Sequence, residues 1–164
     1  MKKINLIFLL IVASKIIVAQ ECEYKFELNV DKFTKDTTYS SIRSAYAADA
    51  YWGARFTKFK SKGASRLYIN LKTPGSTLNV AAKGVKILLE DGTIIEKPDM
   101  KIDYSSITGS PSWAYSAFVG LEKEDIEKMI SSPISDFQLY IYEGKYPAKK
   151  AKKYMEELKC LTDK

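Results

Sequence analysis

The amino-acid sequence predicts an α+β domain: an antiparallel β-sheet of about six to eight strands, with a short helix and a C-terminal amphipathic helix packed on it. Three observations lead to this expectation. Apolar and polar residues alternate with period two through much of the chain, Asp91-Gly92 separates two such runs, and residues 147–161 carry apolar side chains at helical spacing. No internal repeat, low-complexity tract or linker interrupts the pattern, so we expect one domain.

The strands are predicted by alternation and by the turns between them. The run at 24–30 has apolar residues at every second position, which is typical of a half-buried strand. A Gly-containing segment, 61–65, predicts one hairpin, and Asp91-Gly92, a dipeptide suited to positive φ, predicts another. The Ala-rich stretch after Thr37-Thr38-Tyr39 is ambiguous, and we expect a strand followed by a loop there. The expected strands cover residues 24–30, 37 to about 43, 55–60, 66–72, 85–89, 93–95, 100–104, 113–119 and 137–142.

Two helices are expected between and after these strands. Residues 122–130 are acidic at their start and are followed by Ser131-Ser132-Pro133, as the helix dipole and proline rules favour. The second helix is predicted from about Pro147 to about Leu161. Its apolar face should lie on the sheet while its lysines cover the opposite face.

The first nineteen residues predict a cleaved signal peptide. Lys2 and Lys3 precede an apolar run at 4–13, and the segment ends in the small residue Ala19. The run is short for a membrane-spanning helix and Lys15 interrupts it, although a retained anchor is the alternative. Lipidation at Cys22 is a further alternative that the preceding Gln-Glu disfavours. We therefore expect residues 20–164 to form the exported domain, which would be periplasmic, on the cell surface or secreted, with no transmembrane segment.

Charge gives a modest constraint on partners. The chain has 26 basic and 20 acidic residues, and cleavage of the leader would remove three lysines, leaving 23 basic residues and a net charge of +3. Nucleic-acid-binding domains usually have a more one-sided balance, and an exported protein seldom meets nucleic acid. The charge indicates at most a modest affinity for anionic cell-surface polymers.

Cys22 and Cys160 are the two cysteines. An even number in an exported protein favours a disulfide between them. Closure of so long a loop would stabilise the fold by roughly 4–5 kcal/mol in the chain-entropy model. Free or intermolecular thiols are the alternative. No Cys-x-x-Cys motif supports a redox role.

The sequence lacks the residues and motifs on which most catalytic mechanisms depend. It contains no histidine, which excludes histidine-dependent triads and histidine acid–base catalysis, and it has no phosphate-binding or nucleophile-elbow motif. No metal or cofactor is expected. Carboxylate chemistry remains available, with Asp49, Asp99 and Asp103 as candidates. Because no paired constellation can be located from spacing, we expect that the protein is not an enzyme.

Aromatic residues give the positive indication of a binding surface. Trp52, beside Tyr51, and Trp113 with Tyr115 are expected in or beside loops. An exposed ring there could stack on a sugar or anchor a protein contact. The alternative interpretation is core packing at strand ends.

Several segments together resemble a group of small secreted bacterial proteins of unassigned function. These segments are Cys22, Asn29-Val30-Asp31-Lys32-Phe33-Thr34, Leu121–Ile126, Asp91-Gly92 after an apolar strand, and the closing Lys159-Cys160-Leu161. The resemblance implies export, one sheet-and-helix domain and a terminal cysteine pair. It implies no activity and no catalytic residues.

The sequence therefore predicts an exported, non-enzymatic binding or interaction protein of the bacterial cell envelope or exterior, with a cell-envelope protein or glycan as partner. Two alternatives are a carboxylate-dependent polysaccharide hydrolase and a structural component of an envelope complex.

Overall fold

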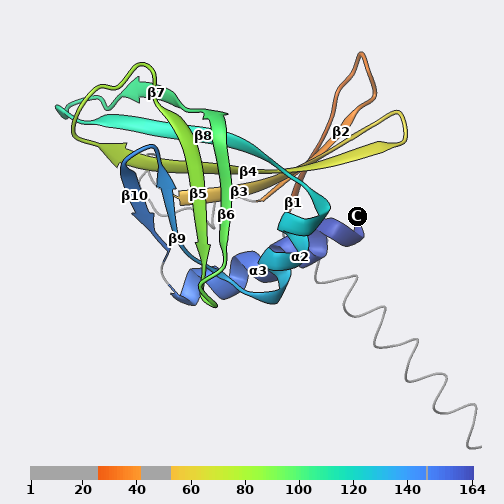
Figure 1. The fold of residues 1–164 in the computed structure, drawn as a ribbon. Helices are drawn as coiled ribbons and strands as arrows, with labels where there is room; N and C mark the ends of the chain where they lie inside the picture. The colour runs from red at the N-terminus through yellow and green to blue at the C-terminus, as the bar shows by residue number, and fades with distance from the viewer. Residues whose placement is uncertain (1–25, 42–52, 147) are drawn as a thin grey trace, which may run out of the picture.

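The computed structural model describes residues 26–41, 53–146 and 148–164, and these form two antiparallel sheets and two helices (Figure 1). The larger sheet has the strand order β1-β2-β3-β4-β8-β7, and these strands span Phe26–Val30, Thr37–Ser41, Gly53–Ser61, Ala64–Gly75, Trp113–Leu121 and Asp103–Ser106. The smaller sheet has the order β10-β9-β5-β6, with strands at Tyr142–Lys145, Ile134–Leu139, Lys83–Leu89 and Ile94–Lys101. The helices are α2, Lys123–Ser131, and α3, Ala148–Asp163. The predicted α+β class is confirmed.

The core lies between the two sheets and beneath α3. In Figure 1 the strands of the smaller sheet run across the long strands β4 and β8, and α3 passes along the other end of the smaller sheet. The buried side chains come from alternate positions of the strands and from one face of α3, because a strand points successive side chains to opposite sides. The largest fully buried apolar side chains include Phe56, Ile69, Leu71, Ile87, Phe137 and Leu158.

Both predicted hairpins are present. Lys62-Gly63 connects β3 to β4, a turn shorter than the expected loop, and Gly63 has a φ of 84°. Asp91-Gly92 connects β5 to β6, with Gly92 at a φ of 85°. The Asp91 side chain accepts a hydrogen bond from the Thr93 N–H at 2.9 Å, which closes the turn.

Two expected strands are in fact pairs of strands. The run at 100–104 is interrupted at Ile102, which is buried, so that β6 ends in the smaller sheet and β7 begins in the larger one. The run at 137–142 contains a hairpin turn, because Tyr140 takes a φ of 59° between β9 and β10. Alternation continued through both points and did not reveal the change of direction. Of the ambiguous stretch, Thr37–Ser41 is a strand as expected, and residues 42–52 lie outside the described residues.

The first hairpin differs from the expectation of a half-buried strand. β1 and β2 extend beyond the core at one end of the larger sheet (Figure 1), and Leu28 and Val30 are 58% and 52% exposed. The Asp31 carboxylate closes the hairpin tip by accepting hydrogen bonds from the Phe33 and Thr34 N–H groups, both at 2.8 Å. The alternation correctly predicted the strand, but the second layer does not reach far enough to cover it.

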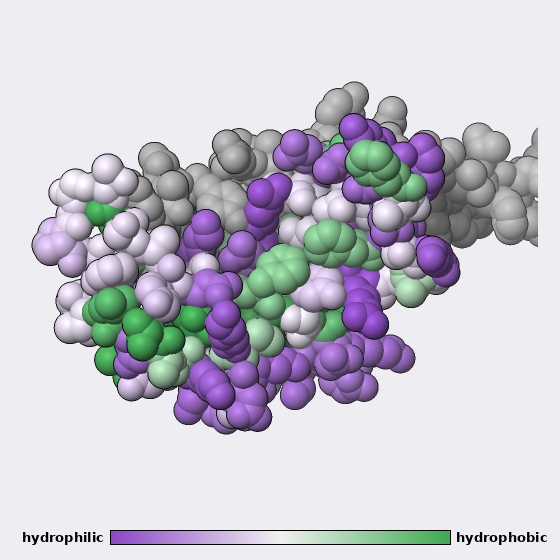
Figure 2. All heavy atoms as spheres, turned by 90° about the horizontal axis from the view of Figure 1, so that it is seen from above, coloured by the Kyte–Doolittle hydropathy of each residue, from purple (hydrophilic) through white to green (hydrophobic). Residues whose placement is uncertain are grey.

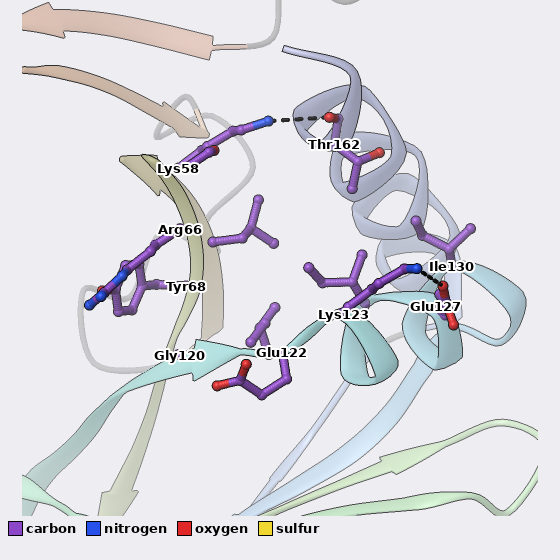
Figure 3. Close-up of a pocket in the computed structure, with 13 residues that line it drawn as sticks. Lys58, Arg66, Tyr68, Gly120, Glu122, Lys123, Glu127, Ile130 and Thr162 are labelled. Carbon is purple, nitrogen blue, oxygen red and sulfur yellow. Dashed lines mark hydrogen bonds and ion pairs between the residues drawn. The ribbon is translucent and has the colours of Figure 1, made fainter. Parts of the chain in front are cut away.

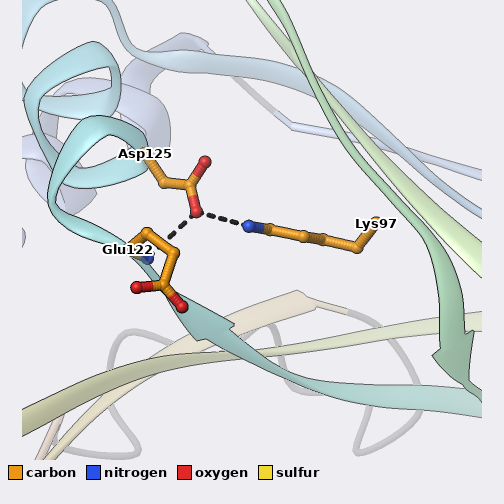
Figure 4. A network of polar contacts seen from close by, with 3 residues as sticks. All are labelled: Lys97, Glu122 and Asp125. Carbon is orange, nitrogen blue, oxygen red and sulfur yellow. Dashed lines mark hydrogen bonds and ion pairs between the residues drawn. The ribbon is translucent and has the colours of Figure 1, made fainter.

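Helix α2 is fixed to the smaller sheet by one partly buried ion pair. Lys97 on β6 lies 2.7 Å from the Asp125 carboxylate, and the same oxygen accepts a hydrogen bond from the Glu122 N–H at 3.0 Å (Figure 4). Asp125 thus caps the helix N-terminus while it binds a lysine of the neighbouring layer. Because both carboxylate contacts are largely shielded from water, they restrain the position of α2 more than a surface pair would.

Gly75 is required where the two sheets meet. A Cβ at this position would lie 2.7 Å from the Tyr115 Cε2 atom and 2.7 Å from the Tyr142 Cζ atom. We predict that Gly75→Ala lowers the free energy of unfolding by about 1–3 kcal/mol, because two packed rings would have to move. Denaturant unfolding would measure this change.

The matched control is Gly120→Ala on β8. The added Cβ would lie 3.6 Å from the Tyr68 Cε1 atom, which is an ordinary contact. We expect this variant to stay within about 1 kcal/mol of the parent. Equal stability of both variants would contradict the packing argument for Gly75.

Candidate functional site

The structure describes two of the three aromatic residues that the sequence singled out, Trp113 and Tyr115. Trp113, half-buried, lies at the start of β8, where its ring packs edge to face against Tyr104 with centroids 6.1 Å apart. Trp52 lies outside the described residues. Tyr115, two residues after Trp113 on the same side of β8, is completely buried. Trp113 and Tyr115 therefore do not form an exposed binding platform.

Tyr115 instead has a structural role. Its ring stacks on Tyr142 with centroids 4.5 Å apart, which joins β8 to β10 of the other sheet. Its hydroxyl donates to the Thr77 carbonyl at 2.6 Å and accepts from the Asn79 N–H at 2.8 Å. Burial raises the pKa of Tyr115, because the phenolate would lose its water. These contacts fix the loop after β4, so the predicted ligand-binding role of Tyr115 is replaced by one in the core.

Three other aromatic side chains form an exposed group that the sequence analysis did not single out. Phe59 on β3, Tyr68 on β4 and Phe118 on β8 lie on the outer face of the larger sheet, and we call them the outer aromatic cluster. Tyr68 stacks on Phe118 at 4.6 Å, and Phe59 meets Tyr68 and Phe118 edge to face at 5.5 and 6.2 Å. Phe59 and Phe118 remain 38% and 44% exposed. Figure 2 shows this face, with apolar groups in its middle and hydrophilic groups beside them.

Strand register brings the cluster together. Tyr68 lies opposite Gly120, which has no side chain, so the Tyr68 ring can extend over β8 toward Phe118. Phe59 lies opposite Arg66, one outward position before Tyr68. A signal for the cluster was present in the sequence: the spacing of three between Phe56 and Phe59 places these two rings on opposite faces of a strand, so one of them had to leave the core.

A groove of about 930 Å³ adjoins the cluster (Figure 3). It runs between the ends of β3, β4 and β8 and the two helices, and Tyr68 lines it as well as belonging to the cluster. Its apolar lining residues are Leu67, Leu121, Ile126 and Ile130. Its charged lining residues are Lys58, Arg66, Glu122, Lys123 and Glu127. The groove and the cluster form one continuous candidate surface.

The charged side chains around the groove differ in the contacts that they make within the protein. Lys123 lies 3.7 Å from Glu127, one turn along α2, and forms an exposed ion pair. The Lys58 ammonium donates to the Leu161 and Thr162 carbonyls at 2.6 and 3.2 Å. Arg66 makes no ion pair or side-chain hydrogen bond to any described residue. Among the described cations that line the groove, Arg66 is therefore the one without such a contact, and its side chain points away from the two helices (Figure 3).

Lys58 acts at the end of α3. The last carbonyls of a helix have no partner within it, and Lys58 supplies donors to them, while Lys60 donates to the Lys164 carbonyl oxygen. Burial lowers the pKa of Lys58 from its usual range, and the nearby charge of Lys60 lowers it further. Lys58 thus has a structural role: it holds the C-terminal end of α3, where Thr162 lines the groove.

The two predicted carboxylate candidates that the structure describes, Asp99 and Asp103, lie on strands of different sheets. Asp49 lies outside the described residues. Asp99 is exposed on β6, and Asp103 is exposed and lies 3.6 Å from Lys101. In the described ranges, no group of three or more acidic or cysteine side chains is placed to hold a metal ion.

Cys160 lies near the C-terminal end of α3, where the sequence predicted it. It has no free thiol, and the described residues contain no free cysteine. Cys22 lies outside the described residues, so its pairing with Cys160 stays a prediction.

Comparison with known proteins finds no matching family model, curated protein or solved structure. Across residues 26–41, 53–146 and 148–164, neither helix is long and apolar enough to cross a membrane.

The contact between Lys58 and α3 can be tested by substitution. We predict that Lys58→Met, which keeps the apolar stem and removes the donors, lowers the free energy of unfolding by about 1–2 kcal/mol. The matched control is Lys145→Met, since Lys145 is exposed on β10 and should change stability by less than about 0.5 kcal/mol. Thermal and urea unfolding would measure both, and an unchanged Lys58→Met protein would contradict the capping role.

The cysteine pair has a direct chemical test. We predict that the protein, purified without reductant, gives no reactive thiol after denaturation and two after reduction. Titration with a thiol-reactive dye, together with the intact mass, would measure this. Two thiols before reduction would show that Cys22 and Cys160 are not joined.

Proposed function

We propose that this chain is an exported, non-enzymatic binding protein of the bacterial cell envelope or exterior, and that the outer aromatic cluster with its groove is the binding surface. The partner is a cell-envelope protein or glycan. The observation that carries the proposal is the position of the three rings: they lie on the face of the larger sheet opposite the core and pack against one another, with Phe59 and Phe118 exposed and Tyr68 half-buried between them.

The energetics favour a binding role over a purely structural one. Cross-strand aromatic pairs stabilise a sheet by about 0.2–1 kcal/mol each, so the cluster does contribute to folding. The same rings leave apolar surface in water beside a groove, and such surfaces are typical of interaction sites. Tyr and other large rings in that position commonly supply most of the free energy of binding.

Direct substitution tests the surface. We predict that Tyr68→Ala and Phe118→Ala each weaken saturable binding to a detergent-solubilised envelope fraction by about thirtyfold, because a central aromatic contact is worth about 2 kcal/mol. Tyr104→Ala is the matched control, because Tyr104 is a similarly exposed ring on β7, beside Trp113. Surface plasmon resonance with immobilised protein would measure binding.

Unfolding curves on the same variants separate binding from folding. Variants that fold like the parent but bind less support the proposal. If both cluster variants bind as tightly as the parent, the cluster is not the binding surface.

A structural component of an envelope complex is the second candidate, and the β1–β2 hairpin favours it. Leu28, Val30 and Phe33 are exposed there, and Phe33 at the tip is 81% exposed. Under this alternative, Phe33→Ser would abolish association with the envelope fraction while Tyr68→Ala would not. The same binding measurement therefore decides between the two surfaces.

The hydrolase alternative finds less support. Among the described groove residues the carboxylates are Glu122 and Glu127, and Glu127 is held in its ion pair with Lys123. Release of reducing ends from polysaccharide, lost in Glu122→Gln, would revive this alternative.

A further inference from the structure

We propose that the outer aromatic cluster binds an acidic polysaccharide, with Arg66 contacting acid groups of the chain while the rings contact its sugar faces. This inference depends on the proposed function above and names its ligand. On the outward side of β4, Arg66, Tyr68, Asn70 and Lys72 alternate with buried residues. Outward neighbours on a strand are about 7 Å apart, so these four side chains form a row about 20 Å long.

Among the described residues, the outer face carries positive side chains that have no acidic partner. Strand register places two acidic residues on this face, Glu27 and Asp103. Glu27 lies 3.7 Å from Arg55, and Asp103 lies 3.6 Å from Lys101. Arg66 has no acidic partner among the described residues, and the same is true of Lys72. A ligand that carries negative charge would therefore complement this row.

Arginine suits an acid group on a sugar chain. Its planar guanidinium binds carboxylate, sulfate or phosphate oxygens through two parallel hydrogen bonds. Phe59 lies opposite Arg66 across the β3–β4 pair, and Tyr68 is the next outward residue on β4. One ligand could thus place an acid group on Arg66 and a ring on Tyr68 or Phe59.

The composition of the surface favours a polysaccharide over an acidic peptide. The large apolar side chains at the outward positions of β3, β4 and β8 are rings, and the Leu, Ile and Val residues of these strands lie at inward positions. Ring faces carry negative electrostatic potential and attract the C–H groups of a sugar face. Arg66 is exposed and Tyr68 and Lys72 are partly exposed along the same strand, whereas the Asn70 side-chain oxygen between them is buried. The spacing of these accessible side chains fits a chain of repeating rings better than a single compact residue.

The test compares polymers that separate charge from sugar. Alginate carries carboxylates, dextran sulfate carries sulfates, dextran is neutral, and polyglutamate is acidic without sugar. We expect alginate or dextran sulfate to bind saturably to the full exported protein, at least tenfold tighter than dextran and polyglutamate. Isothermal titration calorimetry in moderate salt would measure the affinities, and binding should weaken as salt increases.

The variants assign the contacts. Arg66→Gln should weaken binding of the acidic polysaccharide at least tenfold without lowering the melting temperature, and Arg66→Lys should recover part of it. Lys145→Gln is the matched charge control on the other sheet and should bind like the parent. Tyr68→Ala should weaken binding of the same polymer, since both contacts belong to one ligand.

Each result that differs from these expectations would overturn a particular part of the inference. Equal binding of dextran would overturn the acidic part of the inference, and equal binding of polyglutamate would overturn the sugar part in favour of an acidic protein. Equal affinity of Arg66→Gln and Lys145→Gln would overturn the role of Arg66. Failure of every polysaccharide, with cluster-dependent binding to the envelope fraction retained, would reject this inference and leave the proposed function standing.

Discussion

The pairing register of β4 with β8 is the constraint on which the rest of this structure depends. It places Ile69 opposite Val119 on the core side and Tyr68 opposite Gly120 on the outer side. A slip of one residue would exchange the two faces of one strand, which would bury Tyr68 and expose apolar core residues. The same register that closes the core therefore also positions the exposed rings. Folding and the candidate binding surface share one set of backbone hydrogen bonds.

The groove beside the cluster depends on how the helices are fixed. Helix α2 begins directly after β8, and Asp125 holds its first turn while it binds Lys97 of the other sheet. Lys58, which points inward from β3, holds the end of α3. Both contacts join a helix to a strand that is distant in the sequence. The groove walls are thus held by a few partly buried charged groups, whereas the exposed pair on α2 adds little.

Much of the fold could be predicted because alternation and turn residues report local structure. The hairpins at Gly63 and Gly92 and the apolar face of α3 appear as expected. The breaks at Ile102 and Tyr140 were not predicted, because a strand that changes sheet or reverses direction can keep its alternation across the turn. For the candidate site, the type of surface was predicted but not the residues that form it. Exposed aromatic residues were expected, but burial of Tyr115 and exposure of Phe118 depend on which strands become neighbours.

The sequence by itself determined the α+β class, the alternating faces of β4 and β8, and the amphipathic helix that ends the chain. These properties follow from the spacing of side chains along a short stretch of backbone, and that spacing can be read directly from the order of the residues. Only the tertiary structure decided that the strands divide into two sheets, that Tyr115 joins those sheets, and that Phe59, Tyr68 and Phe118 meet. Each of these outcomes depends on contacts between segments far apart in the chain, and local periodicity carries no information about which segments pair.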